Sequence, residues 1–374
     1  MIQMVDLSSQ YLRLKNEIDS AVQEVFKSAE FINGAPVKTF CENLSSYMDV
    51  PHVIPCGNGT DALRIALQAL NIGPENDVLI PAFTYIAPIE AVASVGASPI
   101  LVDVDPKTFN INPELIEKAI TARTKAIIVV HLFGQSCDME AIQKVAEKYK
   151  LTIIEDNAQS LGAAFTFNDG SSKKAGTIGR IGITSFFPTK PLACYGDGGA
   201  LFTSDSELAE QIRLLANHGQ TKKYHHKIVG SNSRLDSVQA AILNVKLKYL
   251  NAFTERRQQI AGQYDQALKD IPEIILPERR SNSTHVYHQY TIKVQNDKRD
   301  ALKSHLAENG IPSMIYYPLP VHEQEAYKWI ARLSGNLTES KLLCEEVLSL
   351  PIHSEMTDEM QTRIIEIVGK FCTD

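Results

Sequence analysis

The sequence predicts an α/β protein with a mostly parallel sheet, and three observations carry this prediction. Six short segments rich in Val, Ile and Phe, each bounded by Gly, Pro or Asp, recur along the chain up to Ser204. Such segments are typical of strands buried on both faces. Amphipathic stretches separate them, and strand–helix–strand alternation produces a parallel sheet. A length of 374 residues corresponds to roughly two domains, so we expect a second domain after the sheet.

Strands and helices are predicted to alternate along the first two thirds of the chain. The expected strands are Asp77–Phe83, Ser98–Val104, Lys125–Phe133, Leu151–Asp156, Gly182–Phe187 and Ala200–Ser204. The expected helices are Thr60–Leu70, Ile86–Val95, Asp138–Lys148 and Ser206–Ala216. Asp138 and Asp205 are residues that commonly cap a helix N-terminus. We therefore expect helices on both faces of the sheet.

After about Arg234 the pattern predicts a smaller α/β domain. Two helical stretches come first, Leu235–Tyr249 and Asn251–Asp270. After Pro277 we expect a strand, a helix, a further short segment and two more helices, at His288–Val294, Lys298–Glu308, Pro312–Tyr317, near Ser340–Leu350 and at Thr357–Phe371. We assign residues 1–240 to an N-terminal segment and the large domain, and residues 241–374 to the small C-terminal domain.

Composition excludes several classes of protein. The formal net charge is -7, and no strongly basic block is present, which argues against a nucleic-acid or anionic-membrane partner. No stretch approaches the roughly 18 apolar residues that span a bilayer, and the N-terminus does not have the pattern of a secretory signal. The six cysteines are scattered without a C-x-x-C pair, so a disulfide framework is not expected. We expect a cytoplasmic protein with free thiols.

Lys190 lies in the strongest local motif, Ser185-Phe-Phe-Pro-Thr-Lys-Pro-Leu-Ala-Cys-Tyr-Gly-Asp-Gly-Gly199. A predicted strand ends just before it, and a Pro-rich turn presents the lysine among apolar and small residues. Such surroundings disfavour the charged amine and lower its pKa. A neutral amine can attack a carbonyl and form a Schiff base. An ordinary exposed lysine is the other interpretation of this residue taken alone.

Two adjacent carboxylates, Glu155 and Asp156, end another predicted strand in the segment Ile153-Ile-Glu-Asp-Asn-Ala-Gln-Ser160. Ligands bind open α/β sheets at the carboxyl ends of the strands, and a carboxylate there can pair with a protonated ring nitrogen. Because Asp, Asn and Ser are also good helix caps, a capping role is the alternative.

A glycine-containing turn, Cys56-Gly-Asn-Gly-Thr-Asp-Ala62, leads into the first predicted helix. Gly57 and Gly59 allow close backbone approach, Thr60 offers a hydroxyl, and the helix start offers free N–H groups to a phosphate. No Gly-Lys-Ser/Thr follows and there is no third glycine, so the turn is neither a P-loop nor a dinucleotide fingerprint. A turn that merely caps the helix is the alternative.

Tyr85, which follows a predicted strand, could stack on a flat ring or pack in the core. Asn232 and Arg234, at the predicted domain junction, suit a phosphate or a carboxylate, or form a capped turn. The histidines of His225-His226 and of His285-x-x-His288 have no acidic or cysteine ligands clustered with them, so we expect no metal site.

The order of these motifs within one α/β domain is informative. A phosphate-type turn, a stacking aromatic residue, a carboxylate after a strand and a Schiff-base lysine follow one another. Together they fit a flat, phosphorylated heteroaromatic cofactor that bears an aldehyde, which is pyridoxal 5′-phosphate (PLP).

The same motifs resemble those of the DegT/DnrJ/StrS family of nucleotide-sugar aminotransferases. They are Gly57-Asn-Gly-Thr60, Pro81-x-Phe-Thr-Tyr85, Glu155-Asp-x-Ala-Gln-Ser160, Ser185-Phe-Phe-Pro-x-Lys190, Tyr195-Gly-Asp-Gly-Gly199, His218-Gly-Gln220 and Asn232-Ser-Arg-Leu-Asp236. The resemblance runs from about Asp6 to the C-terminal helix. It implies the fold-type I architecture of aspartate aminotransferase and a homodimer with shared active sites.

The resemblance also implies roles for individual residues. Lys190 would attach the cofactor covalently and carry the proton between cofactor and substrate. Asp156 would keep the pyridine nitrogen protonated, and Gln159 would lie near the ring hydroxyl. Asn157 stands where many relatives have alanine, which should change contacts behind the ring without removing the cofactor.

Further implied roles concern the phosphate and the face of the ring. Gly59, Thr60 and Ser185 would bind the cofactor phosphate, and Asn232 would reach it from the neighbouring subunit. Tyr85 would stack on the ring. Some family members are dehydratases with histidine at the lysine position, so a lysine there favours transamination.

The motifs are most similar to a branch that uses L-glutamate to aminate the C3 keto group of a UDP-linked 2-acetamido-2-deoxy hexuronic acid, for surface polysaccharide biosynthesis. In that branch the residue matching Arg234 reaches the sugar carboxylate. The branch has His-Tyr-Pro where this chain has Tyr316-Tyr317-Pro318, so a hydrogen-bonding group is kept but the charge that histidine can carry is lost. The alternative is a C3 or C4 aminotransferase acting on a dTDP- or UDP-linked keto-6-deoxy sugar.

Three other interpretations fit the residues less well. A dinucleotide oxidoreductase would lack the third glycine and leave Lys190 without a role. A cysteine desulfurase would need a cysteine-bearing loop that the scattered cysteines do not provide. A regulatory descendant of the fold would not need both Lys190 and Asp156, and no added DNA-binding segment is visible.

Overall fold

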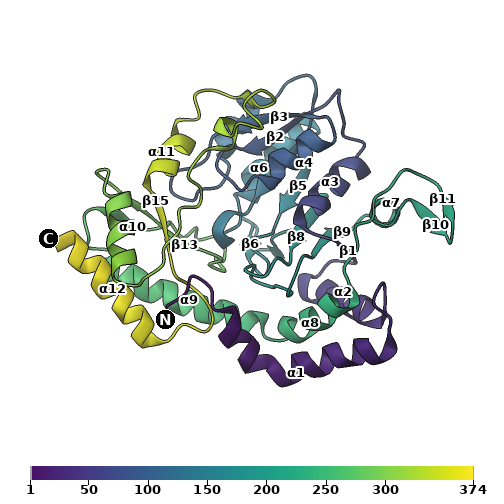
Figure 1. Cartoon of the computed structure of the whole chain (residues 1–374). Helices are drawn as coiled ribbons and strands as arrows, with labels where there is room; N and C mark the ends of the chain where they lie inside the picture. Colours follow the sequence, from purple (N-terminus) through teal and green to yellow (C-terminus); the bar gives the residue numbers. More distant parts are fainter. Residues whose placement is uncertain (1, 374) are drawn as a thin grey trace.

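A computed structural model describes residues 2–373 of the chain, which form a large sheet with helices on both faces and a smaller sheet beside it (Figure 1). The large sheet has eight strands in the order β1-β9-β8-β5-β4-β2-β3-β14. Its strands are β1 (His52–Cys56), β2 (Asp77–Pro81), β3 (Ser98–Val102), β4 (Thr124–Val130), β5 (Thr152–Asp156), β8 (Ile181–Ser185), β9 (Gly199–Thr203) and β14 (Arg332–Leu333). Only β9 pairs antiparallel with its neighbours, so the predicted mostly parallel sheet is confirmed.

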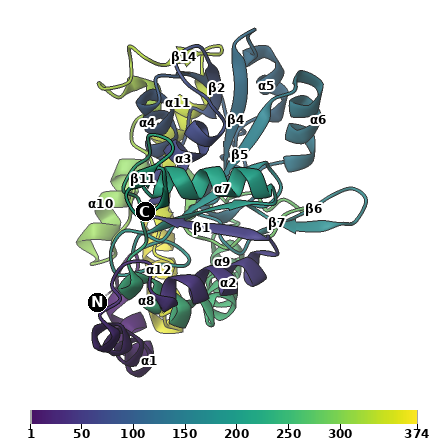
Figure 2. The same cartoon turned by 90° about the vertical axis from the view of Figure 1, so that its right-hand side faces the viewer.

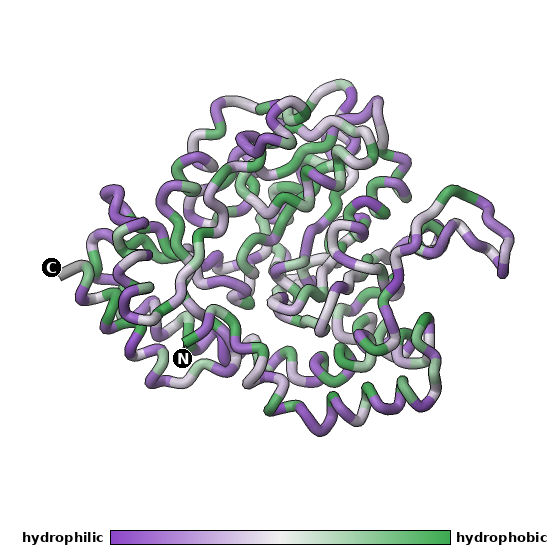
Figure 3. The backbone as a smooth tube through the Cα atoms, in the orientation of Figure 1, coloured by the Kyte–Doolittle hydropathy of each residue, from purple (hydrophilic) through white to green (hydrophobic). Residues whose placement is uncertain are grey.

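The helices that connect these strands cover both faces of the sheet (Figure 2). One face packs on α3 (Gly59–Ala69), α4 (Ala87–Ser94) and α7 (Ser206–Ala216). The other packs on α5 (Pro113–Ala119) and α6 (Met139–Tyr149). Successive strand residues face opposite sides, and apolar residues are buried on both sides. Much of the chain in the middle of the body is accordingly green in Figure 3. The continuous apolar segments in the sequence reflect this burial on two faces.

The first helices of the chain were not predicted as elements. α1 (Leu7–Ser28) and α2 (Ala35–Met48) pack against α8 (Ser237–Leu247). In α2 the residues Phe40, Leu44 and Met48 recur every four positions and are fully buried, which is the spacing of one helix face.

The smaller sheet has three strands, β12 (Ile274–Ile275), β13 (Tyr290–Val294) and β15 (Val347–Leu350). It packs with α9 (Leu250–Leu268), α10 (Arg299–Glu308) and α12 (Asp358–Thr373), while α11 (Thr338–Glu346) precedes β15. The helix expected near Ser340–Leu350 is therefore wrong in its last four residues. They form a strand because they pair antiparallel with β13 and bury Leu348 and Leu350 in the C-terminal core.

One further strand end differs from expectation in a way that matters for the site. The strand predicted over Lys125–Phe133 ends at Val130, because Leu132–Gly134 forms a tight 3₁₀ turn with Phe133 at a φ of 57°. Two hairpins leave the body, β6 (Ala164–Thr166) with β7 (Ser172–Lys174), and β10 (Gln220–Lys222) with β11 (His225–His226).

The position of the predicted domain boundary, between residues 240 and 241, lies within α8. Ile2 at the other end of the chain packs against the C-terminal core. The division into two domains stays a prediction. Within residues 2–373 no helix has the length and apolar character to cross a membrane, and no cluster of three or more metal-ligating side chains occurs.

Candidate active site

A cavity of about 840 Å³ opens at the carboxyl ends of the central parallel strands. Nine of the predicted site residues line it: Gly59, Thr60, Tyr85, Asp156, Gln159, Ser185, Lys190, Tyr316 and Tyr317. Asn232 and Arg234 do not line it. Residues separated by more than 250 positions thus meet at the edge of the sheet where ligands bind in this class of fold.

Lys190 reaches the cavity from the turn that follows β8. Its backbone N–H donates to the carbonyl of Phe187, which closes the turn 2.9 Å away. Surrounding protein lowers the pKa of the amine by desolvation, against the opposing charge of Asp156. A buried amine with a lowered pKa is neutral more often at neutral pH, and a neutral amine is the nucleophilic form.

Asp156 ends β5 and faces the same cavity. It is buried, and burial raises the pKa of its carboxyl, opposed by a hydrogen bond from the Ala158 N–H and by the charge of Lys190. Oδ1 accepts that N–H at 3.0 Å, and Oδ2 accepts no hydrogen bond from a described residue. A cationic partner at Oδ2 would offset the cost of burying this charge.

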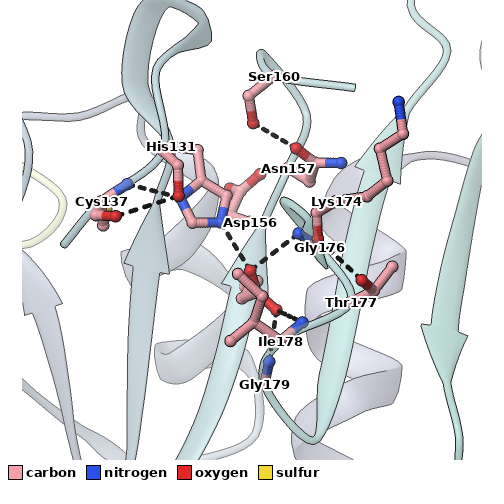
Figure 4. A network of polar contacts seen from close by, with 12 residues as sticks. His131, Cys137, Asp156, Asn157, Ser160, Lys174, Gly176, Thr177, Ile178 and Gly179 are labelled. Atoms are coloured by element: carbon pink, nitrogen blue, oxygen red, sulfur yellow. Dashed lines mark hydrogen bonds and ion pairs between the residues drawn. The ribbon is translucent and has the colours of Figure 1, made fainter. Parts of the chain in front are cut away.

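Glu155 is next to Asp156 in β5, so its side chain faces the opposite side of the sheet. It joins the segment after β4 to the segment before β8, and Figure 4 shows its partners His131, Gly176, Ile178 and Gly179. It accepts hydrogen bonds from the backbone N–H groups of Gly176, Ile178 and Gly179. A fourth comes from His131 Nε2, 2.9 Å away, after β4. The Cys137 N–H donates to His131 Nδ1 at 3.0 Å, which identifies the neutral tautomer that carries its proton on Nε2.

The start of α3 forms the floor of the cavity near Ser185. The Asn58 side chain caps the helix by accepting the N–H of Asp61, which leaves the N–H groups of Gly59 and Thr60 available to a ligand. A Cβ on Gly59 would lie 2.8 Å from Ser185 Cβ, so only glycine fits there. Backbone N–H groups at a helix start beside a serine hydroxyl are suited to a phosphate.

An aromatic wall closes another side of the cavity. Tyr85 is 54% exposed, and its ring centroid lies 6.1 Å from that of Tyr317. The Gln159 amide accepts the Phe133 N–H at 2.8 Å and donates to the Tyr317 hydroxyl at 3.0 Å. These bonds fix Tyr317 and leave its own proton free to point into the cavity.

Sequence inspection missed several residues that line the cavity. Thr84 and His288 are both buried, and Thr84 Oγ1 and His288 Nδ1 have no partner among the described residues. Burial, aided by the charges of Lys190 and Arg257, holds the pKa of His288 well below its usual range, so the ring is neutral. Arg257 fixes this segment by donating to the carbonyls of Tyr287 and Ile352 at 3.0 and 2.8 Å. The H-x-x-H spacing pointed to His288 only as a metal ligand, which its surroundings do not favour.

Asn232 and Arg234 lie beside the cavity rather than in it. Asn232 forms an isolated antiparallel bridge with Asn217. Ser233, the residue between Asn232 and Arg234, accepts the Gly57 N–H at 2.9 Å and donates to Asp61 at 2.6 Å. The segment is thereby tied to the α3 turn. Asn157 also points away from the cavity: its side chain accepts from Ser160 and lies against Gly176, so the departure from alanine is accommodated behind the site.

The residues present fit PLP. A helix start with free N–H groups and Ser185 suits the phosphate, and the unpaired Asp156 oxygen suits a protonated pyridine nitrogen. Lys190 suits the aldehyde and Tyr85 the flat face of the ring. Each feature lies on the same cavity, so one small molecule can meet all four.

Comparison with known proteins agrees with this geometry. Residues 12–369 match the DegT/DnrJ/EryC1/StrS aminotransferase family. The chain is 44% identical over 99% of its length to a pleiotropic regulatory protein of Geobacillus stearothermophilus, covering 98% of that protein. It is 43% identical over 94% of its length to the UDP-2-acetamido-2-deoxy-3-oxo-D-glucuronate aminotransferase of Pseudomonas aeruginosa, covering 95% of it. It is 42% identical over 99% of its length to the dTDP-3-amino-3,6-dideoxy-alpha-D-galactopyranose transaminase of Aneurinibacillus thermoaerophilus, covering 99% of it.

Solved structures give the same result. An aminotransferase of this family from Brucella abortus superposes over the whole of both chains with a TM-score of 0.95 at 42% identity. A Bacillus subtilis protein solved with the cofactor PMP, the aminated form of PLP, superposes with a TM-score of 0.87 at 33% identity, covering 96% of this chain and 82% of that one. The predicted fold and cofactor are thus confirmed, and the chain belongs to the DegT/DnrJ/EryC1/StrS family of PLP-dependent nucleotide-sugar aminotransferases.

Proposed function

We propose that this enzyme transfers the amino group of L-glutamate to the C3 keto group of a UDP-linked 2-acetamido-2-deoxy hexuronic acid, for surface polysaccharide biosynthesis. The observation that carries the proposal is the meeting of Lys190, Asp156 and Tyr317 on one cavity that also contains the α3 helix start. This set provides an amine, a charge partner and a hydrogen-bond donor in the places that transamination requires.

In this proposal each of the chain's own residues at the site has a separate role. PLP, when bound, supplies a ring that withdraws electrons from the substrate carbon. Asp156 remains ionised against the ring nitrogen and keeps that nitrogen protonated. Lys190 Nζ would hold the cofactor covalently and, when released, would carry the proton between the substrate carbon and the cofactor. The N–H groups of Gly59 and Thr60, with Ser185, hold the phosphate in place through these changes.

The choice of sugar rests on residues at the edge of the cavity. The two sugar-aminating relatives described above have nearly equal identity to the chain, 43% and 42%, although their names specify a carboxylated and a deoxy sugar. Both names place the amine at C3, which supports amination at that carbon. Arg234 supports the uronic acid because its guanidinium can bind a carboxylate through two hydrogen bonds. Tyr316, as a neutral residue, favours the alternative, a dTDP- or UDP-linked keto-6-deoxy sugar.

We further propose a homodimer with shared active sites, in which Asn232 and Arg234 serve the cavity of the neighbouring subunit. The support is that both lie outside the cavity of their own chain, and that Lys190 is the only lysine or arginine among the described residues that line it. A substrate with several negative charges needs more positive charge than one chain brings to the cavity. We expect the enzyme in the cytoplasm, where nucleotide sugars are made.

The first test is the absorption spectrum of the PLP-loaded enzyme before and after addition of L-glutamate alone. We expect the yellow band to give way to the shorter-wavelength band of pyridoxamine phosphate, with release of 2-oxoglutarate. A yellow enzyme that does not respond would point to another amino donor. An enzyme that cannot be loaded with PLP would contradict the proposal.

The sugar is tested by offering the aminated enzyme the two classes of keto sugar in parallel. We expect the UDP-linked uronic acid to restore the yellow band fastest. Arg234→Gln should lower kcat/KM for that substrate by at least tenfold. It should change kcat/KM for a 6-deoxy substrate by less than about twofold, because only the uronic acid has a carboxylate for Arg234 to bind. A faster reaction with the 6-deoxy sugar, unaffected by the substitution, would favour the alternative.

A further inference from the structure

The ring of His288 is a buried polar group on the cavity. His288 is 5% exposed and lines the cavity, and its Nδ1 has no hydrogen-bond partner among residues 2–373. Buried polar groups in folded proteins nearly always have a partner, and an exception at a cavity calls for a reason such as a catalytic role. The ring therefore suits a contact with a ligand in the cavity.

Two neighbouring segments fix the backbone of His288. On one side, Arg257 of α9 donates to its carbonyl at 3.4 Å. On the other, the Gln289 N–H donates to the Phe133 carbonyl at 3.3 Å, in the turn after β4. A Cβ on Gly134 in the same turn would lie 3.0 Å from the His288 nitrogen, so a side chain at that position would push the two segments apart. A hydrogen-bonding group on such a support needs little reorganisation to act on a ligand.

The ring is neutral, and its single proton can be assigned. Burial, together with the charges of Lys190 and Arg257, holds the pKa of His288 well below its usual range. A neutral imidazole has one N–H donor and one acceptor nitrogen. Because Nδ1 meets no acceptor, a proton there would be a buried donor without a partner, which is costly. The proton therefore belongs on Nε2.

His288 lies on the side of the cavity near Lys190. The charge of Lys190 acts on the His288 ring, whereas the charge that acts on the Tyr317 hydroxyl is that of Asp156. Thr84 Oγ1 also lacks a partner among residues 2–373, but it follows β2, which β4 and β5 separate from β8 and Lys190. Among these polar groups, His288 is thus the one nearest to the lysine at which the chemistry takes place.

The chemistry of amination requires a donor at the keto oxygen. When a keto group is aminated, a carbon–nitrogen bond replaces its carbon–oxygen bond, and the oxygen leaves as water with the two protons of the amino group that it receives. Negative charge develops on the oxygen while the new bond forms. A fixed hydrogen-bond donor at that oxygen lowers the barrier, and a neutral imidazole is able to serve as such a donor.

We propose that His288 donates a hydrogen bond from Nε2 to the keto oxygen at the reacting carbon, both when 2-oxoglutarate is formed and when the keto sugar is aminated. The inference rests on the proposed function for the choice of L-glutamate as amino donor. It assigns the carbon–oxygen bond to His288 and leaves the proton at the substrate carbon to Lys190.

The test separates these two steps in one solution. The PLP-loaded enzyme is mixed in D₂O with L-glutamate and ¹³C-labelled 2-oxoglutarate. NMR follows the exchange of the glutamate Cα hydrogen for deuterium, which needs only proton transfer at carbon. NMR also follows the passage of ¹³C from 2-oxoglutarate into glutamate, which needs the carbon–oxygen bond to break.

Two substitutions of His288 test the donor. His288→Phe keeps a flat ring without a donor, and we expect it to slow the passage of ¹³C by about 10²-fold while hydrogen exchange slows less than about threefold. His288→Gln places an amide N–H near the position of Nε2 and should recover at least roughly a tenth of the wild-type rate of ¹³C passage. An equal fall of both rates in His288→Phe would show that the residue only maintains the site. An unchanged rate of ¹³C passage would show that it has no role. Either result would overturn the proposal.

His353→Phe is the matched control. His353 is 2% exposed, neither ring nitrogen has a hydrogen-bond partner among residues 2–373, and it does not line the cavity. We expect this substitution to change both rates less than about twofold. The absorption spectrum of each PLP-loaded variant confirms that it folds and holds the cofactor.

A measurement without substrate tests the assigned proton. ¹⁵N NMR of the histidine-labelled enzyme at neutral pH should show the His288 ring as neutral with its proton on Nε2, in signals that are absent from the His288→Phe spectrum. A charged ring, or a proton on Nδ1, would overturn the proposal. A wild-type enzyme that neither exchanges the glutamate hydrogen nor transfers ¹³C would contradict L-glutamate as the donor, and the proton on His288 would then still decide the proposal for this residue.

Discussion

The floor of the cavity and the hairpin of β10 and β11 contain lysines in opposite environments. Lys190 lies at the end of a buried strand, where desolvation lowers the pKa of its amine. Lys222, Lys223 and Lys227 are exposed on a hairpin. A desolvated amine gains reactivity, while an exposed one remains charged and attracts anions over a distance that salt controls. The same side chain is thus suited to reaction in one region and to attracting anions in the other.

The largest effect is expected from Lys190→Ala. Lys190 is the only lysine among the described residues that line the cavity. Its loss removes both the attachment of the cofactor and the proton carrier, so turnover should fall by at least about 10⁴-fold. Steady-state transamination measures this fall. Lys174→Ala is a suitable control, because that half-buried lysine lies over the Tyr47 ring, 4.8 Å from its centroid, and does not line the cavity. Normal turnover of the Lys190→Ala variant would show that catalysis does not depend on a reactive amine at the floor of the cavity.

The next effect tests whether the floor depends on the polar network beneath it. His131→Phe removes one of the four donors to the buried Glu155 carboxylate. We expect the free energy of unfolding to fall by about 2–4 kcal/mol, because a buried charge loses a partner. Lys148→Met, which breaks an exposed ion pair with Glu117, should cost at most about 1 kcal/mol. Urea unfolding distinguishes the two, and equal losses would show that the network is not structural.

Much of the floor could be predicted from the sequence because its residues follow directly on buried strands. Asp156 and Ser185 end β5 and β8, and the turn before α3 follows β1. Parallel strands bring their carboxyl ends to one edge, so sequence order alone places these groups together.

His288 and Thr84 could not be found in this way. His288 reaches the cavity only because Arg257 and the Gly134 turn hold its segment against the large sheet, which is a tertiary contact without a local pattern. The strand at Val347–Leu350 was missed for the same reason, since a short apolar stretch takes its conformation from its partner. The projecting hairpin of β10 and β11 has no hydrophobic periodicity from which it could be predicted.

A third measurement compares the pH dependence of stability for a buried lysine outside the cavity, Lys246, with that for an exposed lysine on the β10–β11 hairpin. Lys246 is 1% exposed, and its Nζ has no hydrogen-bond partner among residues 2–373. Burial lowers its pKa to about 8, opposed by Cys194. Below pH 8 the amine is protonated in the folded and unfolded chain, so its full burial cost destabilises the fold. Between pH 8 and about 10.5 the unfolded chain binds more protons, and stability rises with pH.

Lys246→Met should therefore stabilise the protein by roughly 2–3 kcal/mol at pH 7 and have almost no effect near pH 10.5. Unfolding free energies across this pH range provide the measurement. Lys223→Met on the β10–β11 hairpin is the matched exposed control and should change the free energy of unfolding by less than about 0.5 kcal/mol. A pH-independent effect of Lys246→Met would mean that the buried amine is neutral throughout or paired in solution.

The smallest expected effect is that of salt, and it tests the difference between exposed and buried lysines directly. Exposed charges are screened by salt, whereas buried ones are screened much less. Raising NaCl from 50 to 300 mM should weaken diphosphate binding by roughly three- to tenfold in the wild type. The rate of reaction with L-glutamate, set by desolvated groups on the floor, should change less. In a variant that combines Lys222→Gln, Lys223→Gln and Lys227→Gln on the hairpin, the salt dependence of diphosphate binding should be shallower, because three exposed charges are lost. If it kept the wild-type slope, the charges that attract the nucleotide would have to lie elsewhere, and Arg234 would be the first residue to replace.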